Sequence, residues 1–380
     1  METMAAVITG RTNAAICAIA VRGCRAGAIC RELAGAEHFE IAPGHYRLCR
    51  IMNGDRQIDE VLIGRESDDR YVINCHGNPL IVEMITAAIA GRGVKVVSGE
   101  DFALAALSEK YSGDTLTVEA KLAQCRALSI EAVRLLQNQT AGGLGGFVRG
   151  HLAADMIDVD GIKKSCREIL AASDIAERML RPMKVVLAGL PNSGKSTLFN
   201  RLCGKDAAIV TDKRGTTRDW IKAACQFGVL AVEIIDTAGL DESLWAMGHA
   251  DKQSQEKTAA LIGQADIILL VIDMNDSSGG DIERTIAKHK SGAIVIKVYN
   301  KADICGHQTS CGLGDGVVIS ASRETNIDGL IKRIVDVTRV KELPPDAAVC
   351  FTARQRALVE AILNTDSPAA IRNILERIIS

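Results

Sequence analysis

Hydrophobic and polar residues follow three different patterns along the chain. Over residues 1–115, short apolar runs interrupted by glycines alternate with helix-like stretches, which predicts a small α+β domain. From residue 118 the apolar positions recur at the period of an amphipathic helix, and a second such stretch covers 161–180. The Arg181-Pro182 pair then predicts an end to that helix.

The third pattern, over 182–341, alternates aliphatic runs with helical stretches. The runs show no polar alternation, as expected of strands that are buried on both faces of a parallel sheet. They lie at 185–188, 229–235, 267–272, 293–298 and 317–319. Helical stretches lie at 195–202, 252–262, 282–289 and 327–337. This order predicts an α/β domain with a mostly parallel sheet.

A last helical pattern covers 352–379, after the Leu343-Pro344-Pro345 break. Because this tail cannot bury its apolar face alone, we expect it to pack on the helices at 118–180. The expected fold is therefore an α/β domain inserted in a helical domain and preceded by a small α+β N-terminal domain. The predicted boundaries are 1–115, 116–181, 182–341 and 342–380.

The composition sets limits on class and compartment. A chain of 380 residues is too long for one typical domain, and 47% hydrophobic residues with only 3% aromatics predict aliphatic cores. The net charge of −2 indicates neither nucleic acid nor membrane as a partner. No apolar run approaches the ~18 residues of a membrane span, and the N-terminus lacks the charge pattern of a signal peptide. We therefore expect a cytoplasmic protein.

The 12 cysteines are scattered, without a C-x-x-C pair or histidines at the spacing of zinc ligands. Reduced thiols are the expected state of such cysteines in the cytosol.

The Gly189-Leu-Pro-Asn-Ser-Gly-Lys-Ser196 segment follows one predicted strand and opens a predicted helix. That is the context in which a Walker A phosphate loop occurs. Glycines let backbone N–H groups approach phosphates, Lys195 reaches the β/γ oxygens, and Ser196 supplies a magnesium ligand. The nucleotide-binding residues predicted here are Gly189, Asn192, Ser193, Gly194, Lys195, Ser196 and Thr197.

Three further motifs follow strand-like runs. Asp236-Thr-Ala-Gly239 follows the run at 229–235. At this place an acid can hold magnesium through water, and Gly239 can sense the γ-phosphate. Asn300-Lys301-Ala302-Asp303 and Ser320-Ala321-Ser322 end the next runs in turn. Because open parallel sheets bind ligands at the carboxyl ends of their strands, four motifs in this order predict a nucleotide site.

The Asn300-Lys301-Ala302-Asp303 motif indicates which base is bound. Asp303 can accept both hydrogen bonds from the N1 and N2 edge of guanine, whereas adenine offers no such donor pair. The sequence therefore predicts GTP or GDP rather than ATP as the ligand. We expect the Ala321 N–H to meet guanine O6, with Asn300, Lys301 and Ser320 completing the base-binding set.

The Gly215-Thr-Thr-Arg-Asp219 segment lies where a switch threonine would ligate magnesium when γ-phosphate is present. We favour Thr217 over Thr216, and a solvated polar loop remains the alternative. Leu240 stands where Ras-like proteins carry the glutamine that orients the attacking water. A monovalent cation beside the phosphates is one physical substitute for it.

These motifs resemble those of the MnmE (TrmE) family of tRNA modification GTPases. The likeness includes the runs Ala208-Ile-Val-Thr-Asp212 and Ile235-Asp-Thr-Ala-Gly-Leu240, and it continues more weakly at 14–23, 75–79 and 98–102. The resemblance implies an N-terminal domain that dimerises and binds tetrahydrofolate. It also implies G domains that pair when GTP and potassium are bound, with Asn192 helping to hold potassium.

The same resemblance implies cooperation with an MnmG-type flavoprotein on the wobble uridine of tRNA. Asp251 aligns with the glutamate that positions water in the family. The chain departs from the family by lacking the C-x-G-K motif after its shortened C-terminal helical part, and by reading Glu66-Ser-Asp-Asp-Arg70 where the family has a G-E-D-type segment. His76 is interpreted as a structural residue of a turn.

The activity expected is hydrolysis of GTP by in-line attack of water, with Lys195, Thr217 and Asp251 as catalytic residues. Magnesium would be held by Ser196, Thr217 and Asp236, and potassium by Asn192. Two functions remain open at this point. One is an enzyme assisting tRNA modification, and the other is a dimeric GTP-dependent switch without that activity.

Overall fold

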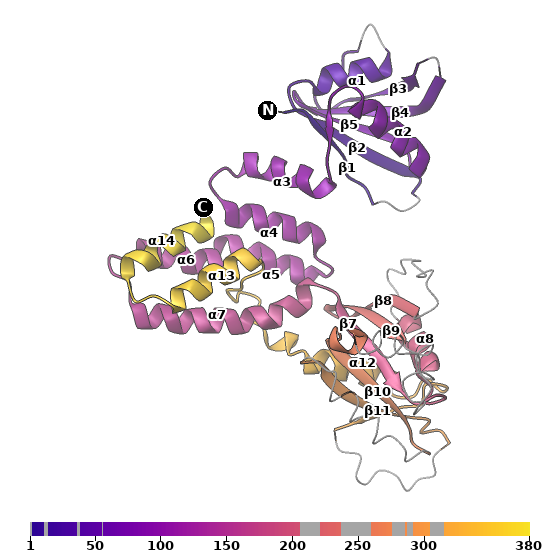
Figure 1. The fold of residues 1–380 in the computed structure, drawn as a ribbon, viewed down its shortest axis with the longest axis vertical. Coiled ribbons are helices and arrows are strands. Elements are labelled where there is room, and N and C mark those ends of the chain that lie inside the picture. Colours follow the sequence, from indigo (N-terminus) through magenta and orange to yellow (C-terminus); the bar gives the residue numbers. More distant parts are fainter. Residues whose placement is uncertain are drawn as a thin grey trace. The chain divides into compact units, whose positions relative to one another are not determined.

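A computed structural model describes residues 2–10, 14–35, 39–54, 56–205, 221–236, 260–275, 286, 292–304 and 315–380. The chain divides into two compact units, Met1–Val118 and Glu119–Ser380. Figure 1 shows the fold and labels its main helices and strands. The second unit contains both a helical and an α/β part.

The first unit is built on a six-stranded sheet in the order β3-β4-β5-β2-β1-β6. The strands run antiparallel from β3 to β1, and β1 pairs with β6 in parallel. Their bounds are β1 Met4–Val7, β2 Ile16–Arg22, β3 Tyr46–Asn53, β4 Arg56–Ser67, β5 Arg70–His76 and β6 Lys95–Val96. The helices are α1 Ala26–Ala34, α2 Pro79–Ala90 and α3 Gly99–Lys110. Helix α3 was missing from the sequence prediction.

Alternating strand residues divide the core of this unit between two faces of the sheet. Ile19 and Ile73 are buried with Ile29 of α1 and Ile85 of α2 on one face. On the other face, the small strand residues Ala6 and Ala20 and the larger Val72 pack with Phe102 of α3. The first unit is therefore a mostly antiparallel sheet with helices packed on both of its faces.

The helical part begins with α4 Thr115–Arg126, which spans the boundary between the two units. Its other helices, all in the second unit, are α5 Ile130–Ala141, α6 Gly143–Ala153, α7 Val159–Leu180, α13 Ala353–Leu363 and α14 Pro368–Ile379. The amphipathic pattern that begins at residue 118 is not one continuous helix, because a break after Arg126 separates α4 from α5. The Ser129 side chain accepts a hydrogen bond from the Ala132 N–H, which caps the new helix.

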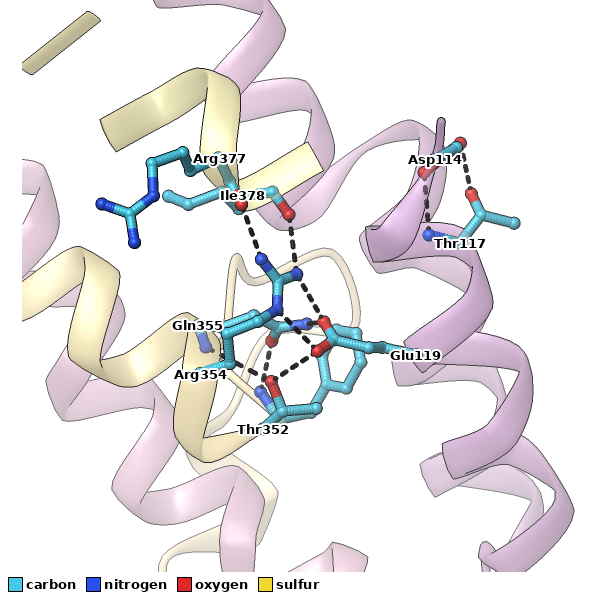
Figure 2. Close-up of polar contacts among 9 residues, drawn as sticks. Asp114, Thr117, Glu119, Thr352, Arg354, Gln355, Arg377 and Ile378 are labelled. Atoms are coloured by element: carbon cyan, nitrogen blue, oxygen red, sulfur yellow. Dashed lines mark hydrogen bonds and ion pairs between the residues drawn. The ribbon is translucent and has the colours of Figure 1, made fainter. Parts of the chain in front are cut away.

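Polar side chains join helices that lie far apart in the sequence. The Glu119 carboxylate of α4 accepts two hydrogen bonds from the Arg354 guanidinium, each of 2.8 Å, and one of 2.7 Å from Gln355 (Figure 2). Arg354 also donates to the carbonyls of Arg377 and Ile378 at 2.6 and 3.0 Å. These carbonyls belong to the last turn of α14, where helix carbonyls lack intrahelical partners. Arg354 thus ties α4, α13 and α14 together.

The α/β part has a second six-stranded sheet, in the order β12-β11-β10-β7-β9-β8. Its strands are β7 Met183–Gly189, β8 Ile221–Phe227, β9 Leu230–Asp236, β10 Ile267–Asp273, β11 Ile294–Asn300 and β12 Val317–Val318. Neighbours are parallel except β8 and β9. The mostly parallel sheet predicted from the aliphatic runs is confirmed, and β8 is a strand that the sequence analysis missed.

Helices α8 Lys195–Lys205 and α12 Ile327–Val337 contribute to the main core of this part, and the 3-10 turn η1 Val340–Glu342 follows α12. Leu198 and Leu202 of α8 are buried there with Leu187 and Ile234 of the strands. Strand residues whose side chains point to the other face of the sheet, such as Val186 and Ile268, belong to a second apolar cluster. Because apolar clusters cover both faces of the sheet, a polar binding site is expected at the ends of its strands. The predicted helices 252–262 and 282–289 fall almost entirely outside the described residues.

Candidate nucleotide site

The phosphate loop leaves the central strand β7 and enters α8, as the Walker A pattern requires. Gly189 ends the strand, and a Cβ at this position would lie 2.3 Å from the Val271 carbonyl oxygen of β10. Gly194 has φ +95°, and its Cβ would lie 2.2 Å from Asn300 Nδ2. Any larger residue at either place would displace neighbouring backbone or Asn300. The glycines are therefore required by close approach.

Asn192 adopts the left-handed conformation with φ 62° and is exposed. Asparagine tolerates this region better than most residues, so the loop can hold its shape without a glycine here.

Lys195 is the buried cation of the loop, with 4% of its surface exposed. Its Nζ donates to the carbonyl oxygens of Gly189 and Leu190, at 3.1 and 2.8 Å. A lysine ammonium with these partners is held across the mouth of the loop, where it can meet the phosphate oxygens of a nucleotide.

The predicted magnesium ligands lie on two adjacent elements. Ser196 is exposed in the first turn of α8, and Asp236 is buried at the end of β9. Strand β9 pairs directly with β7, with Leu187 opposite Asp236. A hydroxyl and a carboxylate are hard oxygen ligands that fit Mg²⁺, which retains several waters of its own. Among the described residues no cluster of three His, Cys, Asp or Glu side chains forms an all-protein metal site.

Asn300 connects the phosphate loop to the base-binding motifs. It is 2% exposed at the end of β11. Its Nδ2 donates to the Ser193 carbonyl at 2.8 Å, and its Oδ1 accepts from the Ala321 N–H at 3.0 Å. The expected donor to guanine O6 thus already has an acceptor in Asn300, and the role of Ala321 toward O6 stays a prediction.

Lys301 lies over the end of the neighbouring strand β10. It has φ 69°, and its Nζ is 2.7 Å from Oδ2 of Asp273. Burial alone would raise the pKa of Asp273, but hydrogen bonds from Lys301 and the Asn275 N–H hold that pKa below its usual range. Asp273 was not predicted as a site residue, although an acid at the end of an aliphatic run was its visible signal.

Asp303 presents an exposed carboxylate at the base-binding end of the site. Ser320 Oγ donates to its Oδ1 at 2.5 Å and Ser322 Oγ to its Oδ2 at 3.2 Å. The Ser320 hydrogen bond is the largest cause of the lowered pKa of Asp303. The group is therefore an ionised, oriented acceptor at neutral pH, as recognition of a guanine edge requires.

Thr217, Gly239, Leu240 and Asp251 lie outside the described residues. Thr197 is described, and it is exposed in the first turn of α8. The structure brings together the other predicted residues from four segments: 189–197, Asp236, 300–303 and 320–321. Asp273, Ser322 and Arg201 join the same region without having been predicted as site residues.

In the first unit, the His76 Nδ1 lies 2.7 Å from Oδ1 of the buried Asp59, whose Oδ2 accepts from the His76 N–H at 2.9 Å. Two contacts to one carboxylate fix the turn at the end of β5.

The ten described cysteines carry free thiols. Burial raises the pKa of Cys30 and Cys75 to about 12 and that of Cys350 to about 11.

A phosphate loop after a central strand, an acid on the adjacent strand and an Asn-Lys-x-Asp motif at the base end define a P-loop GTPase. A family model described as 50S ribosome-binding GTPase matches residues 184–301. The enzyme class predicted from the motifs is therefore confirmed.

Curated proteins named tRNA modification GTPase MnmE are similar to the chain well beyond that domain. The relative from Desulfitobacterium hafniense is 29% identical, over 70% of this chain and 63% of its own length. The relative from Koribacter versatilis is 26% identical over 89% and 80%, and that from Aliarcobacter butzleri 28% over 88% and 81%. The resemblance to MnmE is confirmed, and these identities make the chain a divergent relative. The chain spans less than two thirds of the length of the Desulfitobacterium hafniense relative.

No helix among the residues that the structure describes is long and apolar enough to cross a membrane.

Proposed function

We propose that this GTPase assists tRNA modification, as the name of its relatives, tRNA modification GTPase MnmE, suggests. The target proposed is the wobble uridine, as the family resemblance implies. The observation that carries the proposal is the extent of the likeness. An alignment that covers 89% of the chain includes the N-terminal and helical parts as well as the GTPase domain. A general GTP-binding module would need only the domain over 184–301.

Hydrolysis of GTP at this site depends on charge and position. The buried Lys195 ammonium is placed to neutralise charge that develops on the β- and γ-phosphates. Bound magnesium supplies further neutralisation, and Ser196 and Asp236 are the described residues that would hold it. The N–H groups at the start of α8 add donors toward the phosphates.

The groups that act on the attacking water are part of the proposal alone. Thr217 would complete the magnesium ligands and Asp251 would position the water. Potassium held by Asn192 would take the place of the Ras-type glutamine, in keeping with Leu240 at that position. The left-handed, exposed Asn192 leaves its side-chain amide accessible to such a cation.

The GTPase domain is proposed to be an insertion in a helical domain. Buried Gln139 of α5 supports this, because its Nε2 donates to the Ala347 carbonyl at 2.9 Å and its Oε1 accepts from the Val349 N–H at 3.0 Å. Arg356 of α13 donates to Asp174 of α7 at 2.8 Å. Segments on either side of 182–341 are thus bonded to each other.

The partners and further ligands proposed are a second copy of the chain, an MnmG-type flavoprotein, tRNA and tetrahydrofolate, with the cytoplasm as compartment. The alternative function is a dimeric GTP-dependent switch without modification chemistry. The resemblance implies that modification needs a reactive cysteine. Cys350, the last cysteine of the chain, is buried and its pKa is raised to about 11, which makes it a poor nucleophile at neutral pH and favours the alternative.

Complementation separates the two functions. The gene is expressed in bacteria that lack their own MnmE, and modified wobble uridine is measured in digested tRNA by mass spectrometry. Restoration by the natural chain, but not by Lys195→Ala, supports the proposal. Failure to restore it, in a chain whose purified form hydrolyses GTP, would establish the switch instead.

A further inference from the structure

The Ser320–Thr325 turn carries the serines that orient Asp303. Ser320 and Thr325 exchange two backbone hydrogen bonds, of 3.1 and 3.0 Å, which close the turn. The Asn326 side chain fixes its far end by donating to the Val318 carbonyl at 2.8 Å. Any movement of this turn would therefore move the groups that bind the Asp303 carboxylate.

Glu324 within this turn has φ 56°, in the left-handed region that favours glycine. A glutamate in this conformation costs backbone energy and persists only where surrounding contacts determine it. The contact present is an ion pair in which Arg201 donates to Glu324 Oε1.

Arg201 makes two further bonds to the same turn. Its Nε donates to the Ala321 carbonyl at 3.2 Å, and its second terminal nitrogen to the Ser322 carbonyl at 3.4 Å. The guanidinium therefore spans the turn from Ala321 to Glu324. Its rigid fork of donors suits this task better than the single ammonium of a lysine would.

We propose that Arg201 is a positioning residue for guanine recognition, which holds the Ser320–Thr325 turn on the helix that begins at Lys195. Through Ser320 and Ser322 it fixes the orientation of the Asp303 carboxylate. Through the backbone of Ala321 it fixes the N–H that bonds to Asn300. The helix that binds the phosphates thus also holds, through Arg201, the turn that orients the base-binding carboxylate. The inference rests on the GTP site described above and adds the residue that orients its base-reading end.

The test compares Arg201→Ala with Arg333→Ala, an exposed arginine of α12, in the full chain. Affinities for GTP and ITP are measured by calorimetry, because hypoxanthine keeps N1–H but lacks the N2 amino group. Arg201→Ala is expected to raise the Kd for GTP about tenfold. It should lower the preference for GTP over ITP, since a mobile carboxylate loses its second bond to the base. The kcat at saturating GTP should change far less than KM.

A second pair of variants separates the turn from the ion pair. Glu324→Gly relieves the left-handed conformation and removes the carboxylate, leaving both carbonyl bonds to Arg201. Its effect on Kd should be smaller than that of Arg201→Ala. Arg201→Lys should recover only part of the preference for GTP.

The proposal is overturned if Arg201→Ala has the same midpoint of thermal unfolding as the natural chain and also keeps its Kd for GTP and its preference for GTP over ITP. It is equally overturned if kcat falls while KM and the ratio stay constant. Should the natural chain itself fail to bind GTP, the assignment of the site is wrong, which is a different result from either of these.

Discussion

Asn300 Nδ2 lies 2.8 Å from the Ser193 carbonyl oxygen, across 107 residues of sequence. This bond joins the base-binding motif to the phosphate loop. Because both groups are buried, losing it leaves a polar group without a partner in the protein interior. The two ends of the nucleotide site are therefore one structural unit, and a change at either end should affect binding of the whole nucleotide.

Replacing Asn300 with alanine tests this unit. The variant loses the bonds to both Ser193 and Ala321. We expect the Kd for GDP to rise at least about tenfold, because two buried hydrogen bonds of about 1 kcal/mol each are removed. Calorimetric titration with GDP measures it. An unchanged Kd in a folded variant would show that the two loops are held together by other contacts.

Gly194→Ala should abolish nucleotide binding for a steric reason. The added Cβ would lie 2.2 Å from Asn300 Nδ2, and the residue has φ +95°, which an alanine rarely adopts. The matched control is Gly204→Ala in α8, the helix that follows the loop, where an added Cβ meets no atom within 4 Å. That control should bind normally and be slightly more stable, by up to about 1 kcal/mol. Equal binding by both variants would contradict the described loop.

The sequence predicted the α/β part well because two strong signals agreed there. Aliphatic runs without polar alternation indicated buried parallel strands, and each motif that follows one must lie at the same edge of the sheet. Strand β8 was missed because it lies at the sheet edge, where only Cys225 and Phe227 of Ile221–Phe227 are buried. Only its hairpin with β9 makes it a strand.

Other misses concern side chains whose partners lie far away in the chain. Glu119 and Arg354 are 235 residues apart, and nothing in either local pattern indicates the pair. The role of Arg201 is hidden for the same reason, since its partners follow 120 or more residues later. The break between α4 and α5 was overlooked because the apolar period continues through it, while Ser129 as a capping residue was its only local signal.

Glu119→Ala should destabilise the helical part. The change removes the acceptor for Arg354 and Gln355, of which Gln355 is fully buried. We expect the free energy of unfolding to fall by about 1–3 kcal/mol, the cost of leaving such donors unpaired. Urea denaturation followed by circular dichroism measures it. Glu360→Ala, an exposed residue of α13, is the control and should change stability by less than about 0.5 kcal/mol.

Acidification should weaken the contact between α7 and the start of β10. Burial raises the pKa of Asp266, but bonds from Arg181 at 2.7 and 2.9 Å and from the Lys184 N–H outweigh it, so the pKa is lowered. A folded-state pKa below the unfolded value of about 3.9 means that the unfolded chain binds more protons. The stabilisation is therefore present above that pH and lost as pH falls through the folded value.

Asp266→Asn checks this pH effect. The variant should be less stable than the natural chain at pH 7, and the difference should shrink below about pH 4. Thermal unfolding at a series of pH values gives the comparison. A difference that stays constant from pH 7 to pH 3 would mean that the charge of Asp266 does not contribute.

We propose that Asp303 makes this enzyme a GTPase rather than a general nucleoside triphosphatase. The most direct measurement is phosphate release from GTP and XTP by the natural chain and by Asp303→Asn. Xanthine carries a carbonyl where guanine carries its amino group, so an asparagine amide can donate to it. We expect the natural chain to prefer GTP and Asp303→Asn to prefer XTP. A variant that still prefers GTP as strongly as the natural chain would contradict it.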